Sequence, residues 1–129
     1  MSFKIKSSNK ILNIQDSFTE LFPYLKLDFF KKGNKDSDTK QPILSKDKTL
    51  GECCLITNNP DIEVLPELTV SELEQKITEY YGLEVQISRK SGNVWLLTSF
   101  TDSWTLEEQN HQGEIITHQM NERKSKKAS

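Results

Sequence analysis

The chain has 129 residues, a hydrophobic content of 34% and a mean hydropathy of −0.64, which suits one domain with a modest core. Its formal net charge of −2 lacks the basic excess that is typical of nucleic-acid binding. No apolar run approaches the roughly 18 residues that span a bilayer, so we expect neither a nucleic-acid partner nor a membrane partner.

The N-terminal part of the chain predicts a strand, a helix and a second strand. Apolar and basic residues alternate over residues 3–6, and residues 25–30 alternate in the same way. Between them, apolar residues at spacings of three and four predict a helix that Ser8 or Asn9 caps and that Pro23 ends. The buried stripe of this helix comprises Ile11, Ile14, Phe18, Leu21 and Phe22.

The middle of the chain is harder to assign. Residues 31–49 are polar and contain Gly33 and Pro42, so we expect an exposed, mobile loop. The apolar patch at residues 50–56 fits either a helix or a strand. A turn at residues 58–61 then leads into a third short strand over residues 61–64.

The second helix has the best-defined start in the chain. Thr69 and Glu72 have capping-box spacing, and Leu68 and Leu73 have the spacing of a hydrophobic staple. Gly82 fits the left-handed position just past the helix end. The buried stripe comprises Val70, Leu73, Ile77, Tyr80 and Tyr81.

A β-hairpin follows this helix. Residues 83–88 alternate between apolar and polar, residues 90–93 (KSGN) predict a tight turn, and residues 94–100 predict a fifth strand. One apolar set of the fifth strand must point away from the core, either Trp95 with Leu97 or Val94 with Leu96.

The C-terminal part is polar. Thr105 and Glu108 again have capping-box spacing and predict a short helical turn. Residues 114–120 predict one more edge strand, and residues 121–129 predict a disordered basic tail. We therefore expect a single domain over residues 1–120.

An internal repeat links the two strand–helix–strand segments. The apolar residues of strand 3–6 and its helix match those of strand 61–64 and its helix at a constant offset. After one dropped residue, residues 25–27 match residues 83–85, and Lys31-Lys32 falls on Arg89-Lys90. Two such units predict an α+β two-layer sandwich with the ferredoxin-like split βαβ arrangement, to which the hairpin adds a strand. A β-grasp-like strand order is the alternative.

The sequence lacks the motifs of several common kinds of catalytic and binding site. The chain has no phosphate-binding glycine loop, no HExxH, no CxxC pair and no nucleophile elbow. His111, His118, Cys53 and Cys54 do not have the spacing of a zinc site, and Asp36-Ser37-Asp38 is only a fragment of a calcium loop. We therefore assign no catalytic residue, metal ligand or cofactor, and expect a protein that is not an enzyme.

Two features of the sequence indicate the cellular compartment of the protein. Residues 1–10, MSFKIKSSNK, lack the apolar core of a signal peptide. Cys53 and Cys54 are adjacent and rarely bridge each other in such a position, so their free thiols fit a reducing compartment. We expect a cytoplasmic protein.

Two sets of residues are candidates for recognition. The polar and aromatic residues at the hairpin end suggest a binding surface anchored by tryptophan, made of Arg89, Lys90, Trp95, Asp102 and Trp104. The outward apolar residues of the sheet suggest an interface, made of Phe30, Trp95 and Leu97. The alternative is that Trp104 is a structural clasp docked on the sheet.

Residues 89–110, RKSGNVWLLTSFTDSWTLEEQN, resemble a family of small uncharacterised bacterial proteins over about the second half of the chain. The resemblance implies a bacterial protein but no activity and no site residues. The function we expect is a non-catalytic binding or protein-interaction module that acts through the open sheet face and the 89–110 region, with a protein partner or a homodimer contact. The alternative is a sensor domain for a small molecule or anion.

Overall fold

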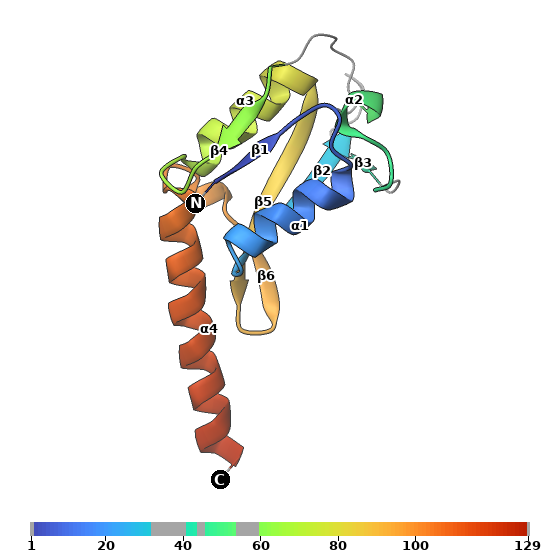
Figure 1. The fold of residues 1–129 in the computed structure, drawn as a ribbon. Coiled ribbons are helices and arrows are strands. Elements are labelled where there is room, and N and C mark those ends of the chain that lie inside the picture. Colours follow the sequence, from blue (N-terminus) through green and yellow to red (C-terminus); the bar gives the residue numbers. More distant parts are fainter. Residues whose placement is uncertain (1, 32–40, 44–45, 54–59, 129) are drawn as a thin grey trace.

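The computed structural model describes residues 2–31, 41–43, 46–53 and 60–128. It shows a mixed α+β fold with a long C-terminal helix along one side (Figure 1). Short helical segments are α2 (Leu50–Cys53) and η1 (Ser99–Thr101), and the longer helices are α1 (Ile11–Leu21), α3 (Val70–Tyr81) and α4 (Leu106–Ala128). The strands are β1 (Phe3–Ile5), β2 (Leu25–Lys31), β3 (Gln41–Pro42), β4 (Ile62–Val64), β5 (Leu83–Ser91) and β6 (Val94–Leu97).

The strands form two antiparallel sheets among the described residues. One pairs β1 with β4, and the other has the order β3-β2-β5-β6. This arrangement differs from the ferredoxin-like order, in which the second and fourth predicted strands lie apart at the two edges. Here β2 pairs with β5 along its whole length, and the buried residues Leu25, Leu27 and Phe29 of β2 share one face of the sheet with Leu83, Val85 and Ile87 of β5.

The core lies between the helices and the inner face of this sheet. The capping box of α3 is formed, with the Thr69 side chain accepting from the Glu72 backbone, and Gly82 ends the helix at φ 69°. The N-cap of α1 is Lys10 without a side-chain bond, whereas Asn9 accepts from the Lys6 backbone instead of capping the helix. Fully buried large side chains of the core include Phe18, Tyr81, Leu25, Ile87 and Ile77.

The strand register relates the two copies of the repeat by a pseudo-two-fold axis. Residues that match in the repeat face each other directly at one place in each strand pair, Lys4 opposite Glu63 and Asp28 opposite Gln86. Away from these centres the pairs are reciprocal: where a residue of the first repeat pairs with a residue of the second, their two equivalents also pair with each other. Examples are Phe3 with Val64, Ile5 with Ile62, Leu27 with Ile87 and Phe29 with Val85.

The repeat extends further than residues 3–31 and 62–89. β3 lies beside β2 as β6 lies beside β5, and the turn before α2 contacts α1 as the turn before α4 contacts α3. In both turns a threonine hydroxyl, that of Thr49 or Thr105, accepts from the backbone three residues later. Matching backbone bonds are Ile11 N to Lys48 O with Val70 N to Trp104 O, and Leu50 N to Asn9 O with Leu106 N to Leu68 O.

The C-terminal segment is where prediction and structure differ most. The helical turn expected at Thr105 begins the long helix α4, which includes residues 114–120, so the predicted edge strand is wrong. The fifth strand ends at Leu97 and not at residue 100, because a 3-10 turn follows. Residues 121–128, for which the sequence suggests a disordered tail, continue α4. Residues 32–40 and 44–45 of the expected mobile loop lie outside the described residues.

Candidate functional site

Strand β6 is the most unusual surface feature of the described chain. All four of its residues are apolar and exposed, with exposed fractions of 55% for Val94, 39% for Trp95, 47% for Leu96 and 57% for Leu97. Phe100, just beyond the strand, is fully exposed. An apolar edge strand is a template for pairing with another chain, and exposed apolar patches of this kind mark interaction sites.

The outer edge of β6 carries backbone N–H and C=O groups, and no strand among the described residues pairs with this edge. Thr98 donates its backbone N–H to Ile87 of β5 over 3.2 Å. Because alternate residues of a strand point their backbone groups to opposite sides, Trp95 and Leu97 direct their N–H and C=O groups away from β5. β6 is the last strand in the order of the sheet.

The opposite edge strand of the sheet, β3, is less open to pairing with another strand than β6 is. Ile43 donates to Phe29 as Thr98 donates to Ile87, so Pro42 of β3 occupies the place in the first copy that Leu97 occupies in the second. Proline has no N–H to offer at an edge and blocks pairing there. β6 has no proline and no charged residue.

The predicted interface residues share the outer face of the sheet. Register places Trp95 and Leu97 on the side of Lys26 and Ser88, and the Lys26 ammonium lies 5.2 Å from the centroid of the Trp95 ring. Phe30 points to the same face but lies at the far end of β2, where it is half-buried opposite Glu84. Trp95 and Leu97 therefore belong to one exposed apolar surface, the β6 surface, which comprises residues 94–97 with Phe100, and Phe30 is separate from it.

The predicted binding residues divide between two faces. Arg89 and Trp104 come together on the helical side, where the guanidinium lies 5.7 Å from the centroid of the indole ring. Lys90 faces Trp95 across the hairpin on the opposite side of the sheet. Asp102 lies in the turn before α4, where its backbone carbonyl accepts from Ser71 of α3. These five residues do not form one site.

The Arg89 cluster joins α4 to the sheet. Arg89 donates from Nη1 to the side chain of the fully buried Gln109 over 3.0 Å. Gln109 in turn donates to the backbone and hydroxyl oxygens of Thr101, both over 2.7 Å. Trp104 is half-buried beside Arg89, and its carbonyl accepts from Val70 of α3. This arrangement fits a clasp that fixes the start of α4.

Polar contacts continue along α4 to the hairpin tip. Asn110 accepts from the Tyr24 backbone over 2.8 Å, and Thr117 accepts from the Gly92 backbone over 3.3 Å. Gly113 is buried, and a Cβ added there would lie 2.9 Å from the Tyr24 Cβ and 3.1 Å from the Arg89 Cγ. The helix therefore lies directly on the inner face of β5, beside Tyr24.

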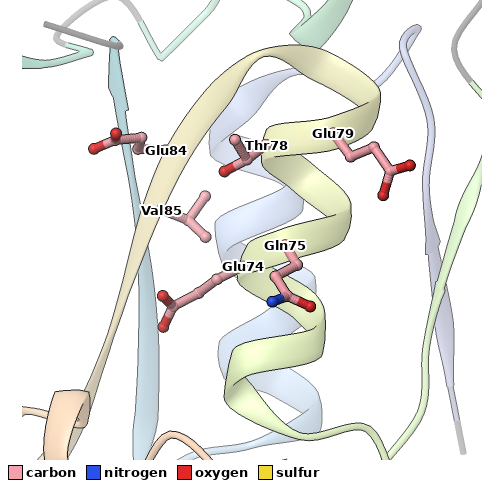
Figure 2. Close-up of a pocket in the computed structure, with 6 residues that line it drawn as sticks. All are labelled: Glu74, Gln75, Thr78, Glu79, Glu84 and Val85. Carbon is pink, nitrogen blue, oxygen red and sulfur yellow. The ribbon is translucent and has the colours of Figure 1, made fainter.

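Two shallow acidic hollows lie elsewhere on the described surface. The one in Figure 2, with a volume of about 500 Å³, is lined by Glu74, Gln75, Thr78 and Glu79 of α3 and by Glu84 and Val85 of β5. Figure 2 shows Glu79 on the opposite side of the helix from Glu84, so these carboxylates do not converge. Neither hollow includes Arg89, Trp95 or Trp104. No metal-binding group of three His, Cys, Asp or Glu residues occurs among the described residues.

Sequence reasoning identified only part of the β6 surface. The sequence predicts Trp95 and Leu97 as interface residues, but not Val94, Leu96 or Phe100. The signal was available, because VWLL is an uninterrupted apolar run and such a run leaves one set of side chains uncovered on an edge strand. Which edge the strand occupies depends on the pairing of β2 with β5, which the run itself does not specify.

Comparisons with protein-family models, with curated proteins and with solved structures gave no match for this chain. Within the part of the chain that the structure describes, no helix is both long enough and apolar enough to cross a membrane.

Proposed function

We propose that this protein is a non-catalytic protein-interaction module that binds its partner through the β6 surface, defined as residues 94–97 with Phe100. The observation that carries the proposal is the exposure of every side chain of β6 together with the outward backbone groups of Trp95 and Leu97. Such a strand offers both hydrogen bonds and apolar side chains to an added strand.

An uncovered apolar strand of this kind is unfavourable in water. Burial of apolar surface contributes roughly 25 cal/mol per Å², and each of these side chains leaves a third or more of its area exposed. A partner strand would bury that area and pair the outward groups in a single contact. Neither of the two acidic hollows is the enclosed apolar cavity that small-molecule sites usually have.

A cytoplasmic setting is part of the proposal. Cys53 is a free thiol in a half-buried position, and free thiols persist in reducing compartments.

Site-specific photo-crosslinking in producing cells tests the function. A benzophenone amino acid in place of Phe100 is expected to form a covalent adduct with the partner. Mass spectrometry of the adduct then identifies the partner protein. The matched control carries the same group at Leu12, which is 41% exposed on α1 and outside the β6 surface. Specific adducts from position 100 support an interaction module. Their absence, or equal adducts from both positions, would contradict the proposal.

A further inference from the structure

We propose that the partner of β6 is a second copy of this chain, paired antiparallel with it across a two-fold axis that passes beside Leu96. This inference rests on the proposed interaction function and names its partner. Two four-stranded sheets would become one continuous antiparallel sheet of eight strands, with β6 of each copy at the centre. The proposal uses the edge that remains open after β2 and β5 have paired.

The β6 edge is complementary to itself. When the outward groups of Trp95 and Leu97 bond to those of a second copy, Trp95 of one copy lies opposite Leu97 of the second copy. Leu96 then faces Leu96 of the second copy. Residues 94–100 (VWLLTSF) carry no charge, so self-pairing brings no like charges together along the strand.

The two-fold mode is already used inside the chain. β2 and β5 pair antiparallel about a pseudo-two-fold centre at Asp28 and Gln86, and β1 and β4 do so at Lys4 and Glu63. An edge pairing of β6 with its copy would repeat this geometry between chains and continue the existing sheet.

Helix α4 would help to cover the inner side of the new strand pair. Asn110 and His118 contact Tyr24, which lies on the β2 side, so helical spacing turns Gln112 and Ile116 towards β6. Three strand spacings separate β5 from β5 of the second copy by about 14 Å, and packed helices approach to about 8–10 Å. The two α4 helices would therefore flank a narrow slot over Val94 and Leu96.

The area sets the expected strength of the dimer. The five apolar side chains of the β6 surface together expose on the order of 500 Å² in each copy, judged from the usual areas of aromatic and aliphatic residues. Two copies would bury at most on the order of 1,000 Å², near the lower limit for a specific interface. We therefore expect a dimer with a dissociation constant in the micromolar range.

Light scattering after size exclusion, over protein concentrations from about 1 µM to about 1 mM, tests the proposal. We expect the wild-type mass to rise towards twice the 14.9 kDa of one chain. Leu96→Glu and Leu96→Lys should each remain monomeric, because like charges would face each other across the axis. An equimolar mixture of the two variants should dimerise, which requires position 96 to face itself. Leu12→Glu is the control and should dimerise as the wild type does.

Leu97→Pro is an independent variant, because it gives β6 the proline that the first internal repeat has at the equivalent position, Pro42. It removes an N–H that points away from β5, so the hairpin should fold while the dimer is lost. Circular dichroism and thermal unfolding establish that each variant is folded.

The outcomes separate this inference from the proposed function. A wild-type monomer at all concentrations, with Phe100 adducts to another protein, overturns the dimer and leaves the interaction module standing. A monomer without adducts contradicts both. A dimer that persists in folded Leu96→Glu and Leu97→Pro variants uses another surface and overturns the inference.

Discussion

The close approach of Gly113 to the sheet leads to a prediction whose sign tests the position of α4. In a solvated helix, Gly→Ala stabilises by about 1 kcal/mol. In this structure the added methyl group would lie 2.9 Å from the Tyr24 Cβ and 3.3 Å from the Tyr24 carbonyl oxygen. Neither atom is at the end of a flexible side chain, so the helix itself must move.

The expected cost follows from these contacts. Overpacking at a tight contact costs about 2 kcal/mol, and displacement of α4 weakens the 2.8 Å bond from the Tyr24 backbone to Asn110, which contributes about 1 kcal/mol. Against the propensity gain of about 1 kcal/mol, Gly113→Ala should destabilise the protein by about 2 kcal/mol.

Urea unfolding followed by circular dichroism measures this change, and the melting temperature should fall by roughly 8 °C. Glu114→Ala, at the next and exposed position, is the matched control and should change the free energy of unfolding by less than about 0.5 kcal/mol. An increase of about 1 kcal/mol in the stability of Gly113→Ala would refute the reasoning, because it would mean that α4 is not in contact with Tyr24.

Two further predictions concern the contacts that hold α3 and α4. Trp104→Ala should destabilise by about 2–3 kcal/mol, because it removes a half-buried indole and its contact with Arg89; a change below about 0.5 kcal/mol in urea unfolding would mean that Trp104 is not a clasp. Thr69→Ala should cost about 1 kcal/mol through loss of the capping box, whereas Thr69→Ser, which keeps the hydroxyl, should unfold within a few tenths of a kcal/mol of wild type; equal losses in both variants would exclude the cap as the cause.

The elements that local patterns specify were predicted well from the sequence. The capping box at Thr69, the left-handed Gly82 and the hairpin turn at Gly92 all depend on a few neighbouring residues, and each is present. The repeat was recognised through its apolar residues. Its extension to the turns at Thr49 and Thr105 was missed, because these turns share little beyond a Thr-Leu pair and a glutamate.

Strand order and the state of the C-terminal segment could not be obtained in this way. Alternation identifies the buried face of β2 and of β5, but it does not state that the two strands pair with each other. Ile115, Ile116 and Thr117 have the β-branched side chains that favour a strand. Docking of Gln109, Gly113 and Thr117 on the sheet makes the segment helical instead, and tertiary packing of this kind overrides local preference.

The two edges of the four-stranded sheet are equivalent in the repeat but opposite in chemistry, and this contrast favours β6 as the contact surface. The first copy places Pro42 where pairing would require an N–H, whereas the second places Leu97 there within an uncharged apolar strand. An open edge of that composition promotes uncontrolled association unless something covers it. Among the described residues, α4 occupies the inner face of β5 and leaves all four side chains of β6 exposed. The two-fold copy that we propose would cover them with a strand of matching length and without charge.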